Sequence, residues 1–294
     1  MRQRSFVVWT ALALGLAVVW AGARPAEAGL VPYVMARASM PAAGEEEEEL
    51  THAEAHAACP FGFDLGSEAH ALGDITQPGA AVMKALSKLT IHDPVFGDRL
   101  EGGADVETYR AFKVTSDTLP AGTEATVDLA IRYEGLLQAQ EGAQGLWSGS
   151  EAEFLLELSC DGKGLAQHSG YAAVFATSEG SDSEAGDDWA GCLVALGGGA
   201  YELTYDDSIQ FTGVVGQVYG LYADLATAVV TSQGAGCENY GDTLALADFW
   251  NTGTYALSSP DPDVGFATMP EPASVSLLGA GVLMVLRRRR RRAA

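Results

Sequence analysis

Two stretches of this sequence contain residue types that could bind a metal ion. In the first, His52, Glu54 and His56 are spaced two residues apart. On a helix, His52 and His56 would share one face. A zinc hydrolase motif of the HExxH type needs a glutamate directly after its first histidine, and Ala53 stands there instead. Zinc is one interpretation of this stretch, and a solvated helix or strand edge is the other.

The second stretch, Ser178 to Asp188, alternates acidic residues with glycine and serine. Calcium takes six to eight oxygen ligands and suits flexible acidic loops of this kind. The spacing does not match an EF-hand, which carries acidic residues at positions 1, 3 and 5, glycine at 6 and glutamate at 12. A solvated loop, with no cofactor, is one interpretation of this stretch. A calcium site is the other, and its ligands would be Glu179, Asp182, Glu184, Asp187 and Asp188.

Other catalytic patterns are not found in the sequence. His70, His92 and His168 are scattered, and no neighbourhood indicates a catalytic triad. Carboxylates are so abundant that no pair stands out as a glycosidase pair. No Gly-x-Ser-x-Gly precedes a helix, and no phosphate-binding glycine loop is present. We therefore expect a protein that is not an enzyme.

The four cysteines are expected to form disulfides rather than a metal or redox site. Cys59, Cys160, Cys192 and Cys237 include no C-x-x-C pair, which argues against a zinc ribbon or a thioredoxin-like site. Disulfides persist mainly in exported proteins, and an N-terminal export signal is expected at residues 1–28, as described below. Four cysteines allow three connectivities, and the spacing does not choose among them.

Alternation of apolar and polar residues predicts that the body of the chain is made of β-strands. Residues 127–133, 153–160, 201–205, 209–212 and 219–229 show it, and strands are also expected at 106–115, 171–177 and 244–257, the last as a pair around Asn251-Thr252-Gly253. Turn signals separate these runs at 119–122, 161–162, 197–199 and 234–236. The composition of Ala80 to Leu89 favours a helix. Such a pattern predicts an all-β fold, an antiparallel β-sandwich of the jelly-roll kind.

Composition shifts divide the chain into five parts. We expect a signal peptide at 1–28, an acidic linker at 29–50 that includes the run Glu45 to Glu49, a β-sandwich at 51–258, a spacer at 259–269 and a C-terminal signal at 270–294. The signal peptide has a basic start, an apolar run from Phe6 to Trp20 and the small-x-small sequence Ala26-Glu27-Ala28. Without both ends, the chain keeps 8 basic and 37 acidic residues, a net charge of −29. That charge argues against binding to nucleic acid or to anionic lipid surfaces.

The last 25 residues have three parts, namely Pro270-Glu271-Pro272, an uncharged run from Ala273 to Leu286, and six arginines, Arg287 to Arg292. Fourteen helical residues span about 21 Å, less than the roughly 30 Å of a bilayer core. Arg287 and Arg288 can snorkel and lengthen the span, and the arginines keep this end on the cytoplasmic side. The tail therefore predicts a marginal apolar helix that anchors the chain transiently in the inner membrane. A plain tail anchor or a buried core helix are the alternatives.

This tail resembles the PEP-CTERM sorting signal of Gram-negative bacteria, with its Pro-Glu-Pro motif, apolar patch and arginine block in the same order. The resemblance covers about 25 residues and extends more weakly to short segments of the body such as Thr118-Leu119-Pro120-Ala121-Gly122-Thr123 and Ala247-Asp248-Phe249-Trp250-Asn251-Thr252. It implies that an exosortase-type enzyme processes the chain near Pro270, Glu271 and Pro272. It also implies an association with exopolysaccharide and a destination at the cell surface or in the extracellular matrix.

The expected function is that of an exported surface or matrix protein with a structural or glycan-associated role. The alternative is a carbohydrate-binding module or a glycan-active enzyme on the same fold. Sugar rings stack on aromatic side chains, and the tryptophans expected in or beside loops are Trp147, Trp189 and Trp250. Several tyrosines, in contrast, fall on the apolar faces of strands and are expected in the core, namely Tyr201, Tyr205, Tyr219 and Tyr255.

Overall fold

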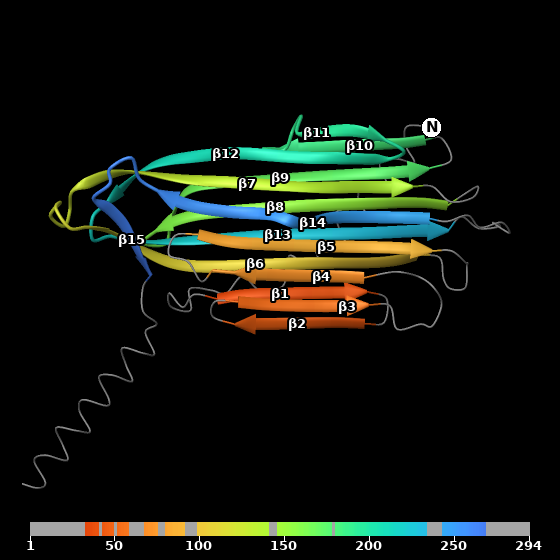
Figure 1. Cartoon of the computed structure of the whole chain (residues 1–294), viewed down its shortest axis with the longest axis horizontal. Helices are drawn as coiled ribbons and strands as arrows, with labels where there is room; N and C mark the ends of the chain where they lie inside the picture. Colours follow the sequence, from red (N-terminus) through yellow and green to blue (C-terminus); the bar gives the residue numbers. More distant parts are fainter. Residues whose placement is uncertain are drawn as a thin grey trace, which may run out of the picture. The chain divides into compact units, whose positions relative to one another are not determined.

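The structure is a computed structural model, and it describes residues 33–40, 43–49, 52–58, 68–75, 80–91, 99–140, 146–177, 180–233 and 243–268. These residues form fifteen β-strands in two antiparallel sheets (Figure 1). The predicted all-β antiparallel sandwich is thereby confirmed. Within the described ranges, no helix is long and apolar enough to cross a membrane. The expected signal peptide, C-terminal helix and arginine tail lie outside these ranges.

The first sheet has eight strands. Seven of them follow one another as β10 (Gly180–Asp187), β9 (Lys163–Thr177), β8 (Leu146–Cys160), β13 (Val218–Gln233), β6 (Arg99–Ser116), β1 (Tyr33–Met40) and β2 (Ala43–Glu49). The eighth, β15 (Val264–Thr268), pairs with the last residues of β6.

The second sheet has seven strands. Their order is β11 (Leu193–Gly197), β12 (Ala200–Val214), β7 (Glu124–Gln140), β14 (Thr243–Ser258), β5 (Ala80–Ile91), β4 (Glu68–Asp74) and β3 (His52–Ala58). Consecutive strands from β5 to β8 alternate between the two sheets, so each sheet is built from segments far apart in the sequence. At one edge of the sandwich lie the short strands β1 to β4 (Figure 1).

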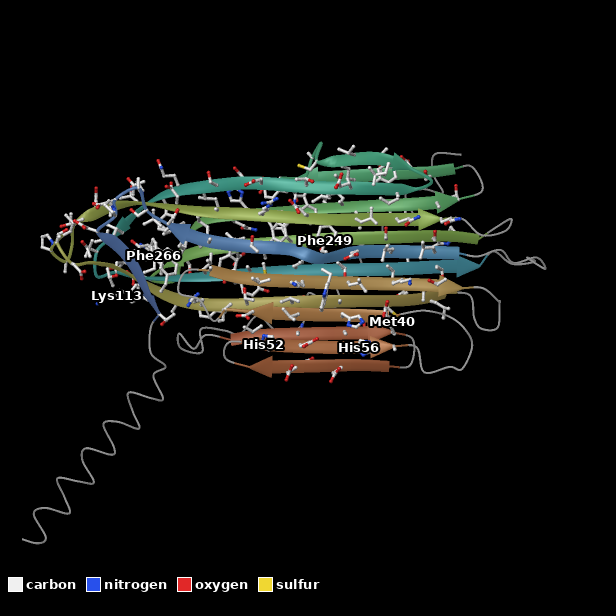
Figure 2. All side chains as sticks on the ribbon, in the orientation of Figure 1. Met40, His52, His56, Lys113, Phe249 and Phe266 are labelled. Atoms are coloured by element: carbon white, nitrogen blue, oxygen red, sulfur yellow. The ribbon has the colours of Figure 1, made fainter. Side chains whose placement is uncertain are left out.

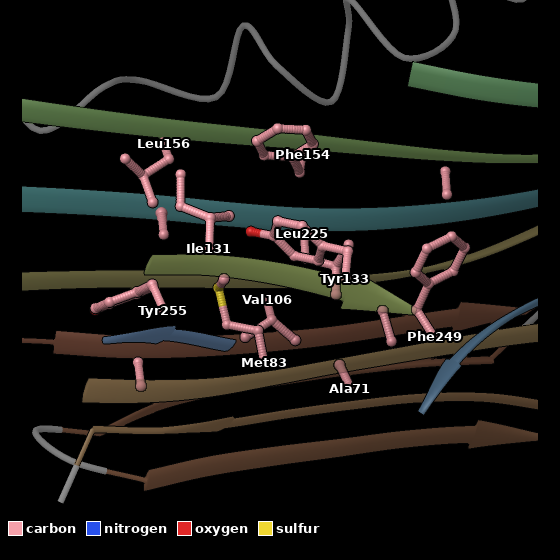
Figure 3. Packing of buried hydrophobic residues seen from close by; sticks show 14 of the residues in the cluster. Ala71, Met83, Val106, Ile131, Tyr133, Phe154, Leu156, Leu225, Phe249 and Tyr255 are labelled. Atoms are coloured by element: carbon pink, nitrogen blue, oxygen red, sulfur yellow. The ribbon is translucent and has the colours of Figure 1, made fainter. Parts of the chain in front are cut away.

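The core lies between the sheets, where alternate residues of each strand point inward. In β7, Val127, Leu129, Ile131 and Tyr133 are all fully buried, as the alternation predicts. Figure 3 shows Tyr133, Phe154 and Phe249, which come from three strands, and the ring centroids of Tyr133 and Phe154 are 4.7 Å apart. Trp189 completes this aromatic group, with its ring centroid 5.0 Å from that of Phe154 and 5.7 Å from that of Phe249.

Small residues make room for the aromatic group. A Cβ added to Gly170 of β9 would lie 2.6 Å from ring atoms of both Phe154 and Trp189. That separation is below van der Waals contact, so only glycine fits there without displacing a core ring.

Two segments expected to link or space the domains belong to the sandwich instead. The expected linker at 29–50 contains β1 and β2, and the expected spacer at 259–269 contains β15. The linker prediction was wrong because like charges repel only where nothing offsets them. In the structure, Glu46 pairs with Arg37, and Glu45 and Glu47 accept backbone hydrogen bonds.

Those backbone hydrogen bonds close the edge of the sandwich. Glu47 Oε2 accepts from the backbone N–H of Glu54 at 2.6 Å, and Glu45 Oε2 accepts from that of His56 at 2.8 Å. Both donors belong to β3, the last strand of its sheet, while the glutamates belong to β2, the last strand of the other sheet. Carboxylates of one sheet thus occupy N–H groups at the exposed edge of the other, where an unpaired strand would otherwise invite association.

Two local predictions about the seven-stranded sheet were also wrong. Ala80 to Leu89, whose composition favours a helix, lies in strand β5, because its alternate residues Ala81, Met83 and Ala85 pack into the core. Residues 244–257, expected as a strand pair, lie in the single strand β14. Asn251-Thr252-Gly253 is not a hairpin turn there but part of an irregularity at which the pairing register with β5 and β7 shifts.

Candidate functional site

Five carboxyl groups face outward from three neighbouring strands of the eight-stranded sheet, and we call them the acidic row. They are Glu151 and Glu153 of β8, Asp224 of β13, and Asp105 and Glu107 of β6. Their chain neighbours Phe154, Leu225 and Val106 point into the core, so the alternation of the strands places the carboxyl groups on the opposite face. In the pairing register, Glu107 lies opposite Asp224, and Ala226 lies between Asp105 and Glu153.

Arg37 of β1 offsets part of the negative charge at one end of the acidic row. Its guanidinium nitrogen Nη1 lies 3.1 Å from Asp105 Oδ2 and 2.9 Å from Glu107 Oε1, while its Nε lies 3.1 Å from Glu46 Oε2. Arg37 therefore bridges three strands of the sheet. It is one third exposed, and the two carboxylates of the row that it contacts are about 15% exposed, so water screens the contact with these two only in part.

Asp224 is buried in the middle of the acidic row, on the strand between β6 and β8. Burial raises the pKa of its carboxyl well above the ordinary value, and the nearby negative charge of Asp105 raises it further. Burial also raises the pKa of Asp105, but hydrogen bonds from Asp224 and Arg37 and the charge of Arg37 act against that shift. Asp224 is consequently the donor and Asp105 the acceptor of the hydrogen bond between them.

A second pair shares a proton on β8. Burial, followed by the charge of Glu153 and a hydrogen bond to it, raises the pKa of Glu151 to about 8. Burial also raises the pKa of Glu153, while its hydrogen bond with Glu151 lowers it. Glu151 thus carries the shared proton at neutral pH. On the neighbouring strands, Tyr171 Oη donates to Glu184 Oε1 at 2.5 Å, and that hydrogen bond, with burial, raises the pKa of Tyr171 to about 12.

Glu151, with its pKa of about 8, changes its protonation state near neutral pH, where an ordinary surface carboxylate is already ionised. Sequence reasoning missed these residues. A weak signal was available, because Asp105 with Glu107 and Glu151 with Glu153 are acidic pairs two residues apart on expected strands, and such pairs share a face. The pairing of β6 with β13 and of β13 with β8 joins the two pairs through Asp224, and no local pattern predicts that pairing.

The acidic residues expected to bind calcium lie on β10 and in the turn after it, apart from Glu179, which is outside the described residues. Asp182 accepts from the backbone N–H of Ser183. Glu184 accepts from the hydroxyl of Tyr171, Asp187 from the hydroxyl of Ser169, and Asp188 from the backbone N–H of Ser169. The Nδ1 atom of His168 lies 2.8 Å from Asp188 Oδ2. Within the described part of the chain, no three of them converge as ligands around one point. The expected loop is mainly an edge strand that pairs with β9.

Cys160 and Cys192 are both free thiols, so a disulfide between these two is absent. Cys160 Sγ lies 3.6 Å from the carbonyl oxygen of Val218, and burial raises the pKa of the Cys192 thiol. Cys59 and Cys237 lie outside the described residues. The same holds for the residues expected in sorting, namely Pro270, Glu271, Pro272, Arg287 and Arg288.

The tryptophans expected beside loops have different environments. Trp189 is fully buried in the core, so its assignment as a sugar-stacking candidate was wrong. Trp147 and Trp250 are partly exposed. The tyrosines Tyr205, Tyr219 and Tyr255 are buried as expected, and Tyr201 packs partly buried against the core.

Comparison with known proteins gave no relative that could identify the chain. No family model matches it, and no curated protein matches it either. Among solved structures, a structure of infectious bursal disease virus Gx strain aligns with 92% of this chain and 70% of its own, at 11% identity and a TM-score of 0.10. A structure of T=1 particles derived from infectious bursal virus aligns with 89% of this chain and 86% of its own, again at 11% identity and a TM-score of 0.10. Likenesses this low carry no argument about fold or function.

Proposed function

We propose that this chain is an exported protein that a PEP-CTERM-type tail sorts to the cell envelope or extracellular matrix, where its body has a structural or glycan-associated role. The observation that carries the proposal is the order of signals in the sequence: an apolar N-terminal segment ending at Ala26-Glu27-Ala28, then the body, then Pro-Glu-Pro, an apolar run and six arginines. The physics of the tail supports a segment that is held briefly in the inner membrane, recognised by an exosortase-type enzyme and removed.

The body suits that destination. It is a two-layered sandwich with a large excess of acidic residues, and such a charge keeps proteins soluble and apart from nucleic acid. In the acidic row, the carboxyl groups bond to one another, to Arg37 or to Tyr222. These internal bonds support a structural role, although Asp105 Oδ1, Glu151 Oε2 and Asp224 Oδ1 are buried without a hydrogen-bond partner among the described residues. The alternative, a sugar-binding module, has less support because Trp189 is buried in the core and cannot stack on a sugar ring.

A jelly roll is the proposed form of the sandwich. The support is the strand order: β5, β14, β7 and β12 lie side by side in one sheet, and β6, β13, β8 and β9 in the other. In chain order these eight strands cross between the sheets at every step except from β8 to β9, as two nested Greek keys require. The remaining strands extend the two edges or, like β15, continue beside β6.

Mass spectrometry of the mature protein from the native host tests the sorting proposal. We expect a C-terminus near Pro270 to Pro272, and we expect the tail to persist in cells that lack the exosortase-type enzyme. Replacing Arg287 to Arg292 with glutamine should release or misroute the protein, because the charge that holds this end inside is lost. Replacement of the same residues with lysine is the matched control and should leave sorting intact. Recovery from the cell surface of a chain that still ends at Ala294 would reject the proposal.

A further inference from the structure

Three potential metal ligands meet on the outer face of the seven-stranded sheet, on the opposite side of the molecule's core from the acidic row. His56 of β3 lies directly opposite His70 of β4 in the pairing register, and Glu68 precedes His70 by two residues on the same face. The imidazole centroids are 4.1 Å apart, and His70 Nε2 lies 3.3 Å from Glu68 Oε2. Ligand atoms of all three residues lie within 4.8 Å of one another, and no other such group is found in the described strands.

The distances between these ligand atoms are close to the distances between the ligand atoms around a bound metal ion. Zinc lies about 2.0–2.2 Å from nitrogen and oxygen ligands, so tetrahedral ligands are roughly 3.4 Å apart. The His70–Glu68 distance already matches this value, and small rotations of the partly exposed side chains can supply the rest. Two imidazoles with one carboxylate are a set that favours Zn(II) and related transition metals over calcium or magnesium, which prefer oxygen ligands alone.

The surrounding structure holds the two histidines in place. Trp250 of β14 lies edge-on to the His70 ring, with centroids 5.6 Å apart. Trp250 lies within the register irregularity between Phe249 and Gly253. Lys84 Nζ lies 5.7 Å from the Trp250 ring centroid. On the other side, the hydrogen bond from the His56 backbone N–H to Glu45 fixes the edge strand at this residue.

We propose that His56, Glu68 and His70 bind one divalent transition-metal ion, with Zn(II) as the preferred ion. Water would complete the coordination, because His56 is exposed on the edge strand. The ion would tie β3 to β4 by side chains in addition to the backbone ladder. This site differs from the His52, Glu54 and His56 set that the sequence offers, because the second histidine comes from the neighbouring strand. It does not depend on the proposed sorting of the chain.

His52 supplies a matched control on the same strand. It lies on the same face of β3 as His56 (Figure 2), and its Nδ1 is 3.8 Å from Asp74 Oδ2. It has a carboxylate neighbour but no cross-strand histidine, since its register partner is Asp74. Surface histidines that bind metal non-specifically would include His52 and His56 equally.

The test is a titration of the purified full chain, freed of metal, with Zn(II) in competition with a chromogenic chelator. We expect one ion per chain, with His56→Gln or His70→Gln weakening the affinity at least tenfold, since even outer-shell changes cost about 10–100-fold. His52→Gln should leave the affinity within about threefold. Zinc should raise the melting temperature of the parent chain and of His52→Gln by mass action, and not that of His56→Gln.

Circular dichroism and metal-free melting of each variant establish that it is folded. His56 stands exposed at the sheet edge, so His56→Gln keeps the test decisive even if His70→Gln fails to fold. Equal loss of affinity in His52→Gln and His56→Gln would overturn the proposal in favour of non-specific surface binding. Binding no tighter in the parent chain than in the His56→Gln, His70→Gln double variant would overturn it as well.

Discussion

The buried carboxyl groups of the acidic row link the stability of the protein to pH. For Glu151, the pKa is about 8 in the folded chain, against an ordinary value of 4.5. Below about pH 4.5 the group is protonated in both the folded and the unfolded chain. Between the two values the unfolded chain loses the proton and the folded chain retains it, so the free energy of unfolding falls as pH rises to about 8. Asp224 acts in the same direction.

We therefore expect the free energy of unfolding to be lower at pH 8 than at pH 5. For Glu151 the difference should be on the order of 2 kcal/mol, allowing for solvent around a partly exposed group. Denaturant unfolding across this range measures it. Glu151→Gln should flatten the profile, because glutamine cannot ionise. Glu124→Gln, at an exposed position of β7, is the control and should leave the profile unchanged. A parent profile that rises toward pH 8 would contradict this assignment.

Gly170 offers a second test at the scale of one residue. Gly170→Ala should destabilise the fold by about 1–3 kcal/mol, because the added methyl group enters the space of Phe154 and Trp189. Gly164→Ala lies on the same strand and meets no atom within 4 Å, so it should cost little. Thermal unfolding of the two variants compares them directly. Equal melting temperatures would mean that the core adapts around Gly170.

Strands β2 and β3 show how individual elements protect the edges of the sandwich. Side chains of Glu45 and Glu47 point from one sheet to backbone donors of the other. Glu46, between them, points to the opposite face and pairs with Arg37. Because successive side chains of a strand point to opposite faces, the same acidic run both caps the β3 edge and pairs with Arg37.

Removal of one capping carboxylate should expose the β3 edge. We expect Glu45→Ala to increase self-association, measured by analytical ultracentrifugation at rising protein concentration, and to cost roughly 1 kcal/mol of stability. Glu46→Ala removes the same charge from the same strand but no edge hydrogen bond, so it should remain as monodisperse as the parent chain. If both variants associate equally, net charge rather than edge capping is the cause.

Element type was predictable where a strand has one apolar and one polar face, as at Val127 to Tyr133. It was not predictable at Ala80 to Leu89, where alanine and lysine favour a helix locally and pairing with β4 and β14 decides otherwise. The linker prediction for Glu45 to Glu49 failed because their partners lie on the neighbouring strands β1 and β3, which the acidic run itself does not indicate. The acidic row and the His56–His70 pair likewise depend on strand register, which one-dimensional patterns do not contain.

Packing across the whole sandwich is uneven. The buried faces of β1, β3 and β4 are mainly alanine, including Ala36, Ala55 and Ala71, whereas the centre holds Trp189, Tyr133 and many leucines. Because burial energy scales with apolar area, at about 25 cal/mol per Å², the alanine-rich end gains less from packing.

Hydrogen exchange should reveal this difference. We expect backbone amides of β4 to exchange roughly tenfold or more faster than those of β14, through local opening of the alanine-rich end. Both strands are paired on two sides, so faster exchange in β4 would reflect thin packing rather than an open edge. Mass spectrometry of exchanged peptides gives the comparison. Equal protection of the two strands would show that the sandwich opens only as one unit.

Strand β6 receives both the first and the last described strands. β1 pairs with its residues 103–109 and β15 with its residues 112–116. If the protein is tethered through its C-terminus, a force on the tether acts on the described fold first at Thr268, which pairs with Phe112. The five-residue β15 would then be the first strand to detach from β6. Its detachment would lengthen the tether before the force reached β14 and the core. Under flow or shear, β15 would therefore detach while the other strands of the sandwich stayed folded.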